Sequence, residues 1–82
     1  MDIYNRVMEI VIELTGSEEL KENPDLDLIE EDIIDSLAFI ELIDTLNEEF
    51  DIEIVPTQMP KDTWRSIKNI SKVVEEIISP KE

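Results

Sequence analysis

Residues 31–43 read Glu-Asp-Ile-Ile-Asp-Ser-Leu-Ala-Phe-Ile-Glu-Leu-Ile, and in this stretch a polar segment gives way to an amphipathic helix. Ser36 lies at the junction. Serine is favoured at a helix N-cap, so one interpretation is that Ser36 caps a helix that begins there. The other is that its hydroxyl is a point of covalent attachment. A helix N-terminus, with its unpaired N–H groups and positive dipole end, favours an anionic substituent such as a phosphodiester.

The helix that begins at Ser36 is expected to end near Phe50 and to have two different faces. At 100° per residue, five apolar residues share the core face: Phe39, Leu42, Ile43, Leu46 and Phe50. The opposite, solvated face holds Glu41, Asp44, Thr45 and Glu48. Leu37 falls on this polar side and Ile40 on its flank. An isolated exposed leucine usually has no function, but Leu37 beside Ser36 and ahead of an acidic stripe suggests a docking surface.

Two further helices are predicted from apolar spacing. The first covers residues 3–15, with Ile3, Val7, Ile10, Val11 and Leu14 on one face and Gly16 at its end. The last covers residues 67–78, with Ser66 as N-cap and Pro80 as its stop. Six isoleucine and valine residues form its apolar face: Ile67, Ile70, Val73, Val74, Ile77 and Ile78.

The segment from Ser17 to Asp35 shows no helical period and is expected to be a long loop, of the kind that tends to be functional. Six aliphatic side chains should anchor it across the helices: Leu20, Leu26, Leu28, Ile29, Ile33 and Ile34. Its acids (Asp25, Asp27, Glu30, Glu31 and Asp32) suggest a calcium loop. The glycine and the fixed ligand spacing of an EF-hand are missing, so we expect no dedicated metal site.

Residues 51–54 are expected to form an extended connector that buries Ile52 and Ile54, since no partner strand exists for them. Pro56 and Pro60 then bracket a segment in which proline can open a short helical turn, and Trp64 is expected to cap the core. The predicted fold class is therefore all-α. We expect one domain over residues 1–82, a small four-helix bundle with three main helices, a short third helix and a long loop after the first helix.

The composition limits the classes of function that the chain can have. The chain has 22 acidic and 7 basic residues, a formal net charge of −15, no histidine and no cysteine. Such a surface repels nucleic acid and anionic membranes and attracts basic protein surfaces. Without thiol or imidazole, the usual nucleophile–base pairs of enzymes are excluded, so any reactive group must be brought to the chain. With neither a signal peptide nor an apolar stretch long enough to span a membrane, a cytoplasmic location is expected. The chain is also expected to be a monomer.

The run Ile33-Ile34-Asp35-Ser36-Leu37 resembles the Asp-Ser-Leu attachment motif of acyl and peptidyl carrier proteins. The long loop before it, the acidic helix after it and the net charge are also similar to that family. The resemblance implies that Ser36 carries 4′-phosphopantetheine, added from coenzyme A by a phosphopantetheinyl transferase that reads Asp35. It also implies that partner enzymes bind a surface on the second helix, formed by Leu37, Ile40, Glu41, Asp44 and Glu48.

Within the family, the chain resembles the D-alanyl carrier branch of Gram-positive bacteria. The similarity is densest at Lys21–Asp25, Glu30-Glu31, Asp35-Ser36, Phe50–Ile52, Asp62–Trp64 and Asn69-Ile70. It implies a D-alanine-activating ligase that loads the arm, and membrane acyltransferase machinery that passes D-alanine to teichoic acids.

Two alternatives stay open. One is a stand-alone acyl or aminoacyl carrier of a fatty-acid, polyketide or nonribosomal peptide pathway. The other is an acidic interaction module without a prosthetic group.

Overall fold

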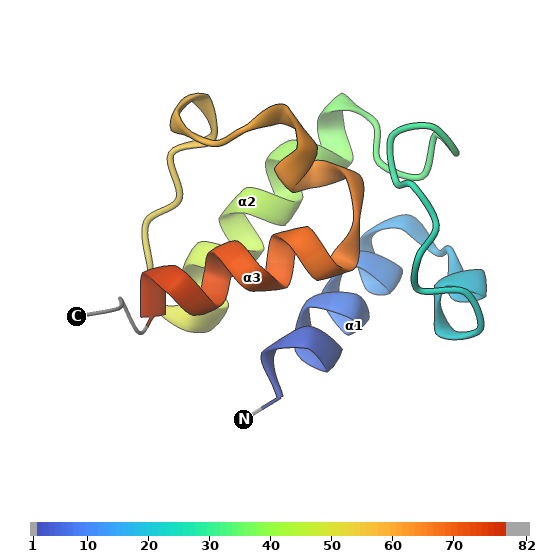
Figure 1. Ribbon diagram of the computed structural model, residues 1–82, viewed down its shortest axis with the longest axis horizontal. Helices are drawn as coiled ribbons and strands as arrows, with labels where there is room; N and C mark the ends of the chain where they lie inside the picture. The colour runs from blue at the N-terminus through green and yellow to red at the C-terminus, as the bar shows by residue number, and fades with distance from the viewer. Residues whose placement is uncertain (1, 79–82) are drawn as a thin grey trace.

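The structure, a computed structural model, describes residues 2–78 and consists of three α-helices joined by irregular segments and short 3₁₀ turns (Figure 1). The α-helices are α1 (Ile3–Thr15), α2 (Ser36–Phe50) and α3 (Ile67–Ile78), and the 3₁₀ turns are η1 (Glu18–Lys21), η2 (Pro56–Gln58) and η3 (Lys61–Arg65). The described residues contain no strand. The predicted fold class is confirmed, as are the limits of α1 and α2 and the start of α3.

Helix α1 is capped at both ends, by Asp2 and Gly16. The Asp2 carboxylate accepts a hydrogen bond from the Asn5 amide at 3.2 Å, as an N-cap does. At the other end Gly16 adopts a left-handed conformation, with φ of 74°, and its amide donates to the Ile12 carbonyl at 2.7 Å. Only glycine takes this φ without strain, so the single glycine of the chain stands at the helix C-terminus.

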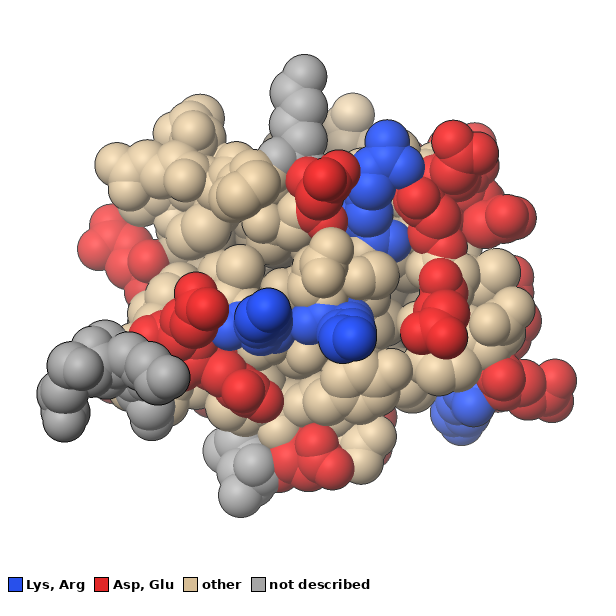
Figure 2. Space-filling model, in the orientation of Figure 1, with Lys and Arg blue, Asp and Glu red and all other residues tan. Residues whose placement is uncertain are grey.

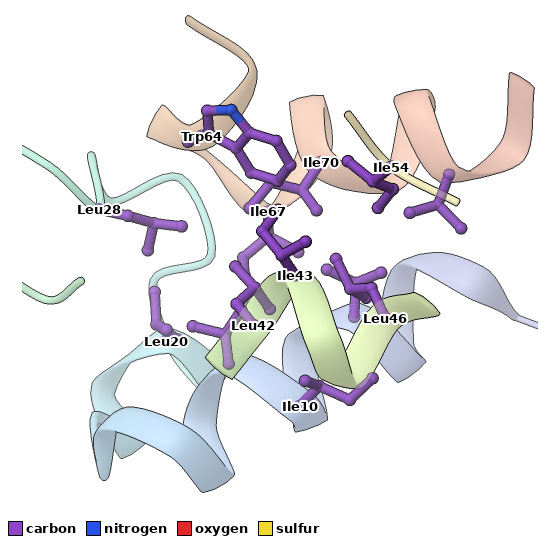
Figure 3. Close-up of a cluster of buried hydrophobic side chains, with 13 residues drawn as sticks. Ile10, Leu20, Leu28, Leu42, Ile43, Leu46, Ile54, Trp64, Ile67 and Ile70 are labelled. Carbon is purple, nitrogen blue, oxygen red and sulfur yellow. The ribbon is translucent and has the colours of Figure 1, made fainter. Parts of the chain in front are cut away.

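The core lies where the three helices meet (Figure 3). Helix α1 packs against both α2 and α3. The side chains that fill the space are almost all aliphatic: Val7, Ile10 and Val11 from α1, Leu42, Ile43 and Leu46 from α2, and Ile67, Ile70 and Val74 from α3. Trp64 is the one buried aromatic residue, 7% exposed, and it lies against the upper edge of this cluster in Figure 3. The predicted core face of α2 is confirmed, with Phe39 and Phe50 partly buried at its ends.

The long segment between α1 and α2 is held against the helices by its apolar side chains. Leu20 and Leu28 are fully buried, and Leu26, Ile33 and Ile34 pack partly against the core. Ile29 is the exception: it is 46% exposed, so its prediction as an anchor is wrong. Ile29 lies in a tight turn whose amides donate to the Asp27 carboxylate, and Leu28 occupies the buried side of that turn.

The connection from α2 to the next turn is extended, as predicted, and buries Ile54 while Ile52 is half-buried. Asn47 in α2 holds it in place. Its side-chain oxygen accepts a hydrogen bond from the Ile54 amide at 2.9 Å, and its carbonyl accepts one from the Ile52 amide at 3.1 Å.

The expected short third helix is made of 3₁₀ turns, with Pro56 at the start of η2 and Pro60 immediately before η3. Ser66 caps α3 as predicted, since its hydroxyl accepts a hydrogen bond from the Asn69 amide at 3.1 Å. Pro80, the predicted stop of α3, lies outside the described residues.

Charges are spread unevenly over the surface. Figure 2 shows one face, on which most of the basic side chains lie over η3 and α3, with acidic side chains around them. Elsewhere, Arg6 of α1 pairs with Glu49 near the end of α2, its Nε donating to the carboxylate at 2.8 Å. This hydrogen bond lowers the pKa of Glu49 below its usual range. Arg6 thus joins α1 to α2.

Candidate functional site

Helix α2 begins with a cap that Asp35 provides. Its backbone is extended, its Oδ1 accepts a hydrogen bond from the Ala38 amide at 2.8 Å, and its carbonyl accepts one from the Phe39 amide at 2.8 Å. The prediction that Ser36 is the N-cap is therefore wrong by one residue. The cap residue must be extended, and Ser36 is already helical.

Because Asp35 and not Ser36 caps α2, the Ser36 side chain is not needed to close the helix. The residue is exposed, and its hydroxyl forms no hydrogen bond with any of the side chains and backbone groups that the structure describes. The Ser36 and Leu37 amides, at the first turn of α2, also have no partner within that range. The start of α2 therefore presents a hydroxyl and two N–H groups at the positive end of the helix dipole.

A cavity of about 420 Å³ opens beside Ser36. Two regions that are far apart in the sequence line it. The end of the long loop and the start of α2 contribute Ile29, Ile34, Asp35, Ser36 and Phe39, and η3 contributes Trp64 and Arg65. The rings of Phe39 and Trp64 meet edge to face, with centroids 5.2 Å apart and planes at 85°. Trp64 thus caps the core, as predicted, and also forms a cavity wall that sequence analysis did not foresee.

The loop and η3 are fastened together next to this cavity. The Arg65 guanidinium donates to the Asp27 carboxylate at 2.7 Å, and the Leu28 amide donates to the Arg65 carbonyl at 2.6 Å. The pKa of Asp27 is lowered, chiefly because its carboxylate accepts a hydrogen bond from the Glu30 amide, and Arg65 adds to the effect. The Asp27 carboxylate in turn raises the pKa of Arg65. These contacts fix the two walls that face α2.

The five residues predicted to form the partner surface are all exposed on α2. Leu37 is 66% and Ile40 58% exposed, and the carboxylates of Glu41, Asp44 and Glu48 lie in solvent. A second, smaller cavity of about 200 Å³ lies between Leu37 and Glu41 on one side and Leu14 and Thr15 of α1 on the other. Exposed large apolar side chains next to carboxylates are typical of a surface that another protein covers.

The chain provides what a phosphopantetheine arm needs at its point of attachment: an exposed hydroxyl, unpaired N–H groups beside it and an adjoining apolar cavity. Among residues 2–78, no group of three or more acidic side chains is arranged to hold a metal ion. In the same part of the chain, no helix has both the length and the apolar character needed to cross a membrane.

Comparison with known proteins gives consistent matches. The family described as "Phosphopantetheine attachment site" matches residues 5–74. The chain is 31% identical over 77 residues to a D-alanyl carrier protein of Bacillus subtilis, which covers 94% of this chain and 99% of that relative. It is 35% identical over 71 residues to a D-alanyl carrier protein of Lactococcus lactis subsp. cremoris, covering 87% and 90%. A third, from Staphylococcus saprophyticus, is 32% identical over 77 residues, covering 94% and 99%.

Proposed function

Since the chain belongs to the phosphopantetheine attachment site family and, within it, to the D-alanyl carrier proteins, we propose that Ser36 holds the 4′-phosphopantetheine arm and that D-alanine travels on this arm as a thioester. The observation that carries the proposal is that two different residues at the start of α2 cap the helix and present a hydroxyl. Asp35 supplies the cap, which leaves the Ser36 hydroxyl exposed and without a hydrogen bond in the described part of the chain. A hydroxyl with no structural task can be modified at little cost to the fold.

The bound arm supplies a thiol, which the chain itself lacks because it has no cysteine. The chain's own residues hold the arm at its base. The Ser36 and Leu37 amides face the negative charge of a phosphodiester on the Ser36 Oγ, and the Asp35 cap keeps this first turn in place. We assign no catalytic residue to the chain. It acts as a shuttle that presents its cargo to partner enzymes.

The proposed docking surface for those enzymes consists of Leu37, Ile40, Glu41, Asp44 and Glu48. Its carboxylates attract basic partner surfaces over a distance, and the two apolar side chains are available for burial on contact. The proposed partners are a phosphopantetheinyl transferase, a D-alanine-activating ligase and membrane acyltransferase machinery that modifies teichoic acids. The carrier itself is proposed to be a cytoplasmic monomer that meets this machinery at the membrane.

A second candidate function follows from the walls of the cavity. Ile29, Ile34, Phe39 and Trp64 make it mostly apolar, which suits an acyl chain better than the ammonium group of D-alanine. The competing proposal is therefore a carrier of acyl or aminoacyl groups in another pathway. The two differ only in cargo, because the attachment at Ser36 is the same.

The attachment is tested by intact mass. The apo protein is incubated with coenzyme A and a promiscuous phosphopantetheinyl transferase, beside the Ser36→Ala variant. We expect one phosphopantetheine on the wild type and none on the variant. An unmodified wild type would favour an acidic interaction module, and a modified variant would place the arm elsewhere.

Cargo is tested on the modified protein. The holo protein is offered to a D-alanine-activating ligase with ATP and D-alanine, and separately to acyl-carrier synthetases with fatty acids. Faster loading of D-alanine is expected. Preferential fatty acylation would contradict the D-alanyl assignment and support the second candidate.

The docking surface is tested by reversing charge at Glu41 and Asp44 together. Both side chains lie in solvent, so we expect an unchanged fold and weaker ligase binding, with a smaller dependence of the affinity on salt. The matched control reverses Glu75 and Glu76, two exposed carboxylates of α3. Equal losses from both pairs would show that only net charge matters and would reject this surface.

A further inference from the structure

Among the residues whose side chains the structure describes, Arg65 is the one cationic residue that lines the cavity beside Ser36. Arg65 lies in η3 and Ser36 is the first residue of α2, so the two are distant in sequence and line the same cavity only in the folded chain. The remaining walls are apolar except for Asp35 and Ser36 themselves. Arg65 already joins η3 to the long loop through Asp27, and a guanidinium has further N–H donors beyond those used in that contact.

The guanidinium of Arg65 is held on two of its three nitrogens. Nη1 pairs with the Asp27 carboxylate at 2.7 Å, and Nε lies 3.3 Å from Asp62 Oδ1. Nη2 forms no hydrogen bond within the described part of the chain. The side chain is 43% exposed. The carboxylates of Asp27 and Asp62 therefore hold the planar guanidinium of Arg65 in place and leave its Nη2 group available to a further anion.

We propose that Arg65 binds the phosphodiester that joins the arm to Ser36, an inference that rests on the proposed function. A phosphodiester adds a negative charge next to Asp35 in a chain whose net charge is already −15. Arginine matches the geometry of phosphate oxygens better than lysine does. Because Asp27 and Asp62 already hold the guanidinium, little side-chain entropy is lost on binding.

Arg65 is in this sense a positioning residue. It contacts the phosphodiester from the η3 side, while the Ser36 and Leu37 amides contact it from the start of α2. These groups would hold the base of the arm from two sides, beside the cavity wall formed by Phe39 and Trp64.

The test compares apo and holo forms of the whole chain. Four proteins are prepared in both forms: wild type, Arg65→Gln, Asp27→Asn and Lys68→Gln. Two quantities are measured: the gain in Tm on going from apo to holo, and the ³¹P chemical shift of the phosphodiester relative to its value in denaturant. The apo form cancels any purely structural effect of a substitution. Lys68 is the matched control, since it is exposed on α3, carries the same charge and does not line the cavity.

We expect Arg65→Gln to reduce the holo-minus-apo gain by about half or more and to move the ³¹P shift towards the denatured value. Lys68→Gln should leave both unchanged. Asp27→Asn should lower Tm in both forms, because it weakens the link between the loop and η3. It should reduce the holo-minus-apo gain less than Arg65→Gln does, because Arg65 loses one of the two carboxylates that hold it but keeps its charge.

Equal gains in wild type and Arg65→Gln would overturn the inference. Equal losses in Arg65→Gln and Asp27→Asn would also overturn it, because Arg65 would then act only through the loop. If Arg65→Gln does not fold, Arg65→Lys keeps the pairing with Asp27 but lacks the planar guanidinium, and a ³¹P shift identical to wild type would count against the inference. Intact mass distinguishes a failure of the proposed function from a failure of this inference alone. A wild-type chain that gains no phosphopantetheine refutes the proposed function, and this inference with it.

Discussion

Replacing Asp35 by alanine removes one hydrogen bond, the one from the Ala38 amide to Asp35 Oδ1 at 2.8 Å. Asp35 is exposed, so the substitution leaves no cavity and the loss of the cap is its main effect. Removal of an N-cap acceptor costs about 1 kcal/mol. For a domain of this size, that corresponds to a fall in Tm of roughly 4–8 °C. Asn and Ser also accept the bond, so Asp35→Asn and Asp35→Ser should remain within about 0.5 kcal/mol of wild type.

The assay is thermal and urea unfolding followed by far-UV circular dichroism, together with the rate of phosphopantetheine transfer. Asp35→Asn separates the two roles of the residue, because it keeps the cap and removes the charge that the transferase is proposed to read. We expect it to be as stable as wild type and modified more slowly. The reasoning is refuted if Asp35→Ala unfolds at the wild-type temperature, or if Asp35→Asn is as unstable as Asp35→Ala.

Three further predictions concern the frame around the site. Leu46→Ala should cost about 2–5 kcal/mol in urea unfolding because Leu46 is fully buried, whereas Leu37→Ala, at a residue 66% exposed, should be nearly neutral; comparable losses would contradict the packing. Gly16→Ala should cost about 1 kcal/mol through its positive φ alone, since nothing lies within 4 Å of the added methyl, and an unchanged Tm would show that the helix end has shifted. Asp27 has a lowered pKa, chiefly because of the Glu30 amide, so it stabilises the fold above the ordinary aspartate pKa and this contribution disappears as pH falls through the lowered value. Asp27→Asn should therefore flatten the acid side of the plot of Tm against pH, and an unaltered slope would assign acid unfolding to other groups.

Local sequence patterns are sufficient to predict the positions and the buried faces of the helices. Apolar residues at spacings of three and four set the faces of α1, α2 and α3, and the residues at their ends (Gly16 and Ser66) have the side chains that such ends require. The sequence also predicts the helix start at Ser36, but the residue that caps the helix is Asp35, one position earlier. Aspartate and serine both cap well, and their order along the chain does not show which of them has the extended backbone.

The walls of the cavity could not be predicted in the same way. Asp27 and Arg65 are separated by 38 positions, and no periodicity links a loop residue to one in a 3₁₀ turn. Asn47 is a similar case: a polar residue on a helix gives no sign that its side chain will hold Ile54 in a later connector. The exposure of Ile29 cannot be predicted either, because composition alone does not show which of two adjacent aliphatic residues a turn will bury.

The separation of the Asp35 cap from the Ser36 hydroxyl has a practical consequence. Since the fold makes no use of that hydroxyl in the described part of the chain, a protein with alanine at position 36 should keep every surface that its partners recognise. Such a chain is a decoy: it competes for the loading enzymes and can never accept a cargo. Produced in excess in a cell, it would deplete the pool of available partners and reveal, by which process fails first, the pathway that the native chain serves.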